Sequence, residues 1–136
     1  MSINNLSRQT GNNGEEYGQW ETTDAILYPV IYIPVSDKEA GKLIIDFNGV
    51  NINTVAAADR YIIIRFKKVN NVISLIGRMA PFNNADTGMT AVDVTISAST
   101  DNTQIILSVT GIANTAVRHS IQVNKLSSAI SSGGYG

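Results

Sequence analysis

Few residues of this 136-residue chain have side chains suited to catalysis. There is one histidine, His119, and no cysteine. Covalent catalysis needs a base close to a Ser, Thr or Cys nucleophile, and no Gly-x-Ser-x-Gly segment is present to expose a serine. His119 alternates with Val117 and Ile121, which favours a core or interface histidine over a catalytic base. The sequence therefore predicts no catalytic residue, and we expect the chain not to be an enzyme.

Carboxylates offer two further kinds of chemistry, glycoside hydrolysis and metal binding. The 11 Asp and Glu residues fall mostly in turns or on polar strand faces, and no pair is favoured as the acid and base of a hydrolase. Asp37 and Glu39 lie in one polar turn, and Asp86 follows two asparagines in another. Neither segment matches a calcium-binding loop, and such residues commonly bond to the backbone of a turn. The sequence predicts no metal site and no cofactor.

The segment 81–90 is a candidate for contact with a ligand. Its residues are mostly turn formers, so it is predicted to be a loop. In this candidate ligand-contact loop the contact residues would be Phe82, Asn83, Asn84 and Asp86. An exposed aromatic ring can stack on a sugar, and the neighbouring polar groups can form hydrogen bonds. A receptor- or glycan-binding role is therefore one of the functions that the sequence allows.

Charge and hydropathy exclude several classes of protein. The chain is 43% hydrophobic and 15% charged, with a formal net charge of -1. This apolar content supports a buried core in one folded domain rather than a disordered chain. A near-neutral chain lacks the basic surface of a nucleic-acid-binding protein, and its apolar runs are too short to span a bilayer. The first residues show no signal-peptide pattern, and we expect no nucleic-acid partner and no membrane insertion.

The composition favours strands over helices. The chain contains 18 Ile and 11 Val but 6 Leu, and β-branched residues pack well on a pleated sheet. Apolar and polar residues alternate with a period of two through most of the chain, which is typical of half-buried strands. We expect an all-β protein, an antiparallel β-sandwich or jelly-roll-like fold of about seven strands. The predicted strands are 25–35, 42–52, 60–69, 72–80, 91–99, 103–110 and 116–126.

The chain divides into three parts by composition. Residues 1–23 are polar and rich in turn formers, residues 24–126 carry the strand pattern, and residues 127–136 form a Ser- and Gly-rich tail. Polar terminal segments without a core of their own are ordered when another surface holds them. We therefore predict that residues 1–23 form an anchoring segment that packs on a neighbouring subunit or partner.

The C-terminal third resembles a pattern found in virion proteins of tailed bacteriophages, including the ends of tail fibres. That pattern has a strand, a turn with V-T-G-x-A-x-T, and an alternating closing strand. It is present in Ile105–Val123, where residues 109–115 read V-T-G-I-A-N-T. Upstream, residues 71–77 are similar to the preceding strand of the family, and residues 56–58 to its Ala-rich connection. The family usually has Trp at the position of His119.

The resemblance covers residues 24–126 and implies a small β-sandwich module of a virion, commonly trimeric, with no catalytic residues. We expect a non-enzymatic structural protein, of accessory, decoration or fibre type, that docks on a capsid or tail through its terminal segment. The expected partners are other copies of the chain, with a homotrimer favoured, and other virion proteins. The alternative is an adhesion module that binds a receptor or a cell-surface glycan.

Overall fold

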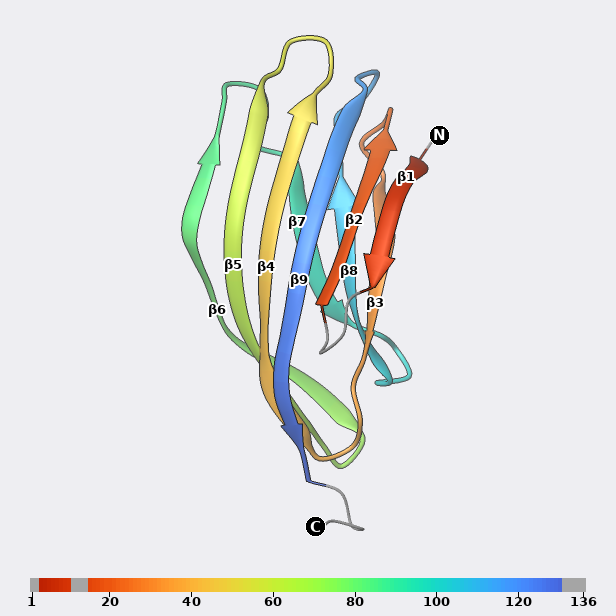
Figure 1. Ribbon diagram of the computed structural model, residues 1–136, viewed down its shortest axis with the longest axis vertical. Coiled ribbons are helices and arrows are strands. Elements are labelled where there is room, and N and C mark those ends of the chain that lie inside the picture. The colour runs from red at the N-terminus through yellow and green to blue at the C-terminus, as the bar shows by residue number, and fades with distance from the viewer. Residues whose placement is uncertain (1–2, 11–14, 131–136) are drawn as a thin grey trace.

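The described residues, 3–10 and 15–130 of a computed structural model, form nine β-strands and no helix. The strands pair antiparallel in two sheets that pack face to face (Figure 1). The prediction of an all-β antiparallel sandwich is confirmed. The six-stranded sheet has the order β1 (Ile3–Thr10), β2 (Glu15–Thr22), β9 (Val117–Ala129), β4 (Glu39–Asn51), β5 (Ala57–Val69) and β6 (Val72–Ala85). The three-stranded sheet has the order β3 (Leu27–Pro34), β8 (Gln104–Thr110) and β7 (Asp93–Ala98).

The expected number of strands was too low because residues 1–23 contribute two. β1 pairs with β2, and β2 pairs along its length with β9 of the same chain. Gly18, Trp20 and Thr22 are the buried positions of β2, and Trp20 is 4% exposed. The polar residues between them obscure this alternation in the sequence. The chain itself therefore holds residues 15–22 in place, and anchoring of the segment on a partner stays a prediction.

The alternation of residues predicted the two faces of the central strands correctly. The inward-facing apolar side chains of β4 and β5 are buried, and they form one core with the buried residues of the smaller sheet. Each such side chain contributes about 2 kcal/mol to stability when it is fully buried. The inward-facing residues of the two strands are Leu43, Ile45 and Phe47 on β4 and Ile62, Ile64 and Phe66 on β5.

The boundary predicted at residue 127 falls inside a strand, because β9 continues to Ala129 opposite β4. The buried carboxylate of Glu39 fixes this pairing. It accepts a hydrogen bond from the Ser127 hydroxyl, and its Oε2 lies 2.7 Å from Lys125 Nζ. Burial acts to raise the pKa of Glu39, but Lys125, Ser127 and the Ser36 N–H together hold it below its usual value. Residues 131–136 of the predicted tail lie outside the described residues.

Asn70 and Asn71, the two residues between the strands predicted at 60–69 and 72–80, form a two-residue hairpin turn between β5 and β6. Both residues have positive φ, 52° and 64°, which a type I′ turn requires. Val69 and Val72 pair directly on either side of the turn. This turn sets the register in which β6 runs beside β5.

We predict that Gly41→Ala destabilises the fold. A Cβ at Gly41 would lie 2.3 Å from the backbone oxygen of Leu126, and backbone of a central strand pair cannot move aside freely. Overpacking of this kind costs about 1–3 kcal/mol. Chemical denaturation measures the loss. The exposed control Ser128→Ala should change stability by less than about 0.5 kcal/mol, and equal stability of the two variants would contradict the prediction.

Candidate functional site: the open face of the six-stranded sheet

In the part of the chain that the structure describes, the smaller sheet covers one face of the six-stranded sheet and leaves the opposite face open (Figure 1). Apolar side chains are exposed on this open face, with Tyr61 at 36%, Met79 at 61%, Phe82 at 53% and Leu126 at 64%. Exposed apolar groups gathered on one face are typical of an interaction surface. We call this surface the outer face. It comprises Gln122, Asn124 and Leu126 of β9, Lys42, Ile44, Asp46 and Asn48 of β4, Asp59, Tyr61, Ile63, Arg65 and Lys67 of β5, and Ile76, Met79 and Phe82 of β6.

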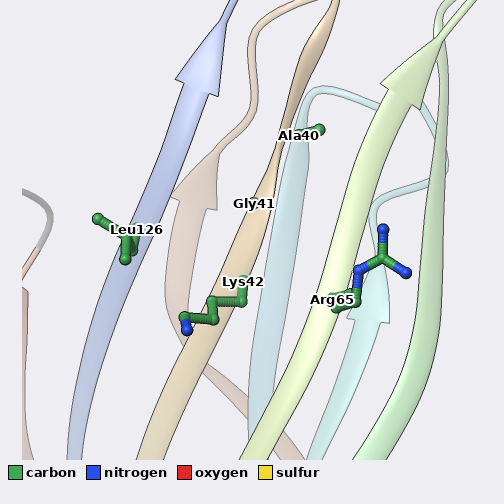
Figure 2. Close-up of a pocket in the computed structure, with 5 residues that line it drawn as sticks. All are labelled: Ala40, Gly41, Lys42, Arg65 and Leu126. Carbon is green, nitrogen blue, oxygen red and sulfur yellow. The ribbon is translucent and has the colours of Figure 1, made fainter.

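A shallow groove of about 390 Å³ lies at one end of the outer face (Figure 2). Lys42 of β4 is the direct cross-strand partner of Arg65 on β5 and of Leu126 on β9. Three adjacent strands therefore bring two cations and one exposed aliphatic side chain together. Ala40 and Gly41 complete the lining with little side-chain bulk, which leaves the groove open to a ligand.

Two like-charged residues lie on adjacent strands of this groove, with their charged groups pointing away from each other (Figure 2). Lys42 and Arg65 are directly opposite each other, an arrangement that costs free energy when no anion is near. Lys67 follows Arg65 by two residues on the same face of β5 and extends the basic area. None of the three forms an ion pair with a described residue. This end of the outer face therefore attracts an anionic group.

The other end of the outer face is acidic. Asp46 lies on β4 between Tyr61 of β5 and Gln122 of β9, and it lines a second hollow of about 210 Å³. Asp59 lies further along β5, where the side-chain amide of Asn48 donates a hydrogen bond to its Oδ1 at 2.8 Å. Neither carboxylate forms an ion pair with a described residue. The outer face thus carries uncompensated charge of opposite sign at its two ends.

An apolar row separates the basic end from the acidic end. Ile44 of β4 pairs with Ile63 of β5, and Ile63 pairs with Met79 of β6. The pairing of β6 with β5 has a bulge on each side of this row. Residues that are three positions apart on β6 therefore pair with residues that are two positions apart on β5. These bulges place Ile76 and Phe82 beside the outward residues of β5. The edge strand thereby widens the apolar part of the outer face.

The predicted ligand-contact loop is in large part a strand. Phe82, Asn83 and Asn84 belong to β6, which continues to residue 85, so the prediction of a loop from Pro81 onward is wrong. Proline lacks a backbone N–H, but β6 is an edge strand and can place a proline where no ladder bond is needed. For this reason the strand pairing continues through a segment whose composition is typical of a turn.

The structure separates the four residues of that segment into two pairs. Phe82 and Asn84 are cross-strand partners of outward-facing residues of β5. Asn83 accepts a hydrogen bond from the buried guanidinium of Arg60. The Asp86 carboxylate accepts one from the first backbone N–H of β5 at 2.8 Å. Asn83 and Asp86 therefore stabilise the local fold, and contact of the four residues with a ligand stays a prediction.

The sequence reasoning did not single out the outer face. The sequence places Arg65 and Lys67 on one predicted strand but does not show which residues lie beside them on other strands. One signal was present, since Ile44 and Ile63 are apolar among polar residues on the same predicted faces. The cross-strand register was needed to show that these two isoleucines lie next to each other.

His119 lies in the core, as the sequence predicted, and is 0% exposed. Its Nε2 lies 2.9 Å from the Thr22 hydroxyl, and its ring centroid lies 6.0 Å from that of Phe47. Burial lowers the pKa of His119 from 6.5 to about 4, so the imidazole is neutral at pH 7. Thr22 is also 0% exposed. A substrate cannot reach this pair, which instead joins β2 to β9.

We predict that His119 makes stability fall in mild acid. The unfolded chain takes up a proton near pH 6.5 that the folded chain takes up only near pH 4. The free energy of unfolding should therefore decrease as the pH falls through this window, by about 3 kcal/mol for a shift of this size. Denaturation at a series of pH values should show a flatter profile for His119→Gln. The contribution of Glu39 to the stability of the fold also decreases in acid, but both proteins contain Glu39. Identical pH profiles for the unchanged chain and His119→Gln would therefore contradict the prediction.

The described part of the chain contains no group of three His, Cys, Asp or Glu side chains that could hold a metal ion. Within the same residues, no helix is long and apolar enough to cross a membrane.

Comparison with solved structures finds a partial likeness to a bacteriophage protein. It is the tailspike protein gp49 of the Acinetobacter baumannii bacteriophage Fri1, described as a capsular polysaccharide depolymerase. The TM-score is 0.43 and the sequence identity is 13%, and the likeness covers 94% of this chain and 21% of the tailspike chain. This chain therefore spans about a fifth of the tailspike's length. No family model matches the sequence, and no curated protein matches it.

The tailspike comparison corrects one expectation. The sequence predicted that the chain is not an enzyme, whereas the similar structure belongs to a depolymerase, which is an enzyme. The prediction rested on the scarcity of His and Cys and on the local setting of each carboxylate. Sheet register can bring carboxylates from distant strands together, so that argument does not exclude catalysis. A likeness at this TM-score assigns no activity and no catalytic residue to the chain.

Proposed function

We propose that the chain is a structural module of a bacteriophage virion that docks through the outer face of its six-stranded sheet. The open outer face carries this proposal, because it combines exposed apolar side chains with two ends of opposite, uncompensated charge. Covering side chains such as Met79, Phe82 and Leu126 contributes about 1–2 kcal/mol each. A partner of complementary shape and charge would gain this free energy on binding.

The resemblance of Ile105–Val123 to modules of tailed-phage virions supports the virion setting. The edge strands β1 and β6 also support an assembly role, because each has one side that pairs with no described strand. We also propose that the chain is an accessory, decoration or fibre-type protein, and that the segment 1–23 docks on a capsid or tail. Other copies of the chain and other virion proteins are the proposed partners, and the trimer stays a prediction.

We predict that Met79→Asp reduces incorporation of the chain into virions. The substitution places a carboxylate in the centre of the apolar row, where docking would remove its water. Met79 is 61% exposed, so the isolated fold should tolerate the change. Quantitative mass spectrometry of virions purified from a phage that encodes the variant measures the copy number. We expect a loss of at least about tenfold, as for one well-buried interface contact.

The matched control is Leu27→Asp. Leu27 is 50% exposed on β3 of the smaller sheet and lies outside the outer face. Incorporation of this variant should equal that of the unchanged chain. Equal losses for the two variants, or absence of the unchanged chain from virions, would contradict the proposed function.

A second candidate function is binding of a glycan on the outer face. Tyr61 and Phe82 are direct cross-strand partners, and both are exposed. Neighbouring aromatic rings on a flat face suit stacking against sugar rings. The basic groove of Lys42 and Arg65 lies on the same face and would accept a carboxylate-bearing sugar.

We predict that any specific glycan binding weakens up to about tenfold in Phe82→Ala, since one aromatic ring contact contributes about 0.5–1.5 kcal/mol. A glycan array with the purified full chain measures this. Tyr32→Ala removes an aromatic side chain that is 43% exposed on the smaller sheet and serves as the control. Absence of specific binding by the unchanged chain, or equal binding by all three proteins, would reject this second candidate.

A further inference from the structure

We infer that the outer face binds the outer face of a second copy of this chain, about a two-fold axis that runs along the Ile44–Ile63–Met79 row. This inference rests on the proposed function, because it names the partner of the same docking surface. The two six-stranded sheets pack face to face about 10 Å apart, as sheets do inside a sandwich. Their strands run antiparallel across the contact.

The symmetry operation determines which residues meet. A two-fold axis that lies midway between the two sheets, parallel to them and perpendicular to the strands, reverses each strand and places it over its counterpart in the second copy. Residues at equal distances on either side of the apolar row are then brought together. On β4, Lys42 and Asp46 are each two residues from Ile44. Lys42 of one copy therefore faces Asp46 of the other, and the symmetry forms this ion pair twice.

On the neighbouring strand β5, residues of opposite charge also lie at equal distances on either side of Ile63. Lys67 and Asp59 each lie four residues from Ile63, so the ammonium of one copy faces the carboxylate of the other. Arg65 and Tyr61 each lie two residues from Ile63, which brings a guanidinium over an aromatic ring, a favourable cation–π contact. The like charges that are adjacent within one copy thus each gain a favourable partner in the second copy.

The edge strand adds apolar contacts of the same symmetry. Ile76 and Phe82 lie three residues to either side of Met79, and the two-fold axis brings one against the other. Ile44, Ile63 and Met79 lie on the axis and pack against their own counterparts. The contact therefore has an apolar centre with ion pairs on both sides, which is the usual arrangement of a specific interface.

The outer face is large enough for a dimer. Four strands about 4.8 Å apart, over a length of about 30 Å, enclose about 600 Å² in each copy. The total of about 1,200 Å² reaches the lower limit for a specific protein–protein interface. Because the ion pairs are within reach of water at its rim, the association should weaken as salt is added.

Charge reversal in two separate variants tests the inference. In Lys42→Asp the residues at positions 42 and 46 are both acidic, and in Asp46→Lys both are basic, so each variant alone should dimerise at least about tenfold more weakly. Mixing the two variants restores both ion pairs, and a heterodimer with the affinity of the unchanged chain should form. Native mass spectrometry and analytical ultracentrifugation of the full-length proteins measure these species. Lys38→Asp reverses an exposed charge outside the outer face and should leave dimerisation unchanged.

The homotrimer that the family resemblance implies is the competing outcome. A trimer, a chain that is monomeric at every concentration, or variants that fail to recover on mixing would overturn the inference. The exposed positions of Lys42 and Asp46 allow the variants to fold, and equal unfolding midpoints confirm this. The proposed function is judged separately by virion incorporation. If the chain is monomeric in solution but Met79→Asp still abolishes incorporation, another virion protein covers the outer face. In that case the inference is wrong and the proposed function stands.

Discussion

The unequal size of the two sheets is the constraint on which the structure depends. Each strand of a sheet presents alternate residues to opposite faces, and the three-stranded sheet can cover one face of the six-stranded sheet. The covered face supplies the core, in which the buried side chains of β4 and β5 join those of the smaller sheet. The outward residues of the same strands must then meet either water or a partner. Their types, apolar in the middle and charged at both ends, fit a partner better than water.

Much of the fold could be predicted from the sequence because strands of period two have clear alternation. The faces of β4 and β5, the Asn70–Asn71 turn and the buried position of His119 were all predicted. β1 and β2 were not predicted, since their outward and edge positions are polar and few of their residues enter the core. The extension of β6 was missed because an edge strand tolerates the proline and asparagines that normally end a strand.

The outer face could not be predicted in the same way, because it exists only after the register of four strands is known. Lys42 and Arg65 are 23 positions apart in the chain, yet they are direct partners in the sheet. A net charge of -1 also gave no sign that basic and acidic side chains are separated along one face. Overall charge reports the sum of the charges, whereas recognition depends on where they lie.

The claim that the outer face is covered by a partner is tested most directly by hydroxyl-radical footprinting of the full chain. Dilute protein is compared with concentrated protein and with purified virions. Met79, Phe82 and Leu126 should lose reactivity on association, while Val55, which is 73% exposed in the turn between β4 and β5, should keep it. Outer-face residues whose reactivity, like that of Val55, is unchanged between the three conditions would contradict the account.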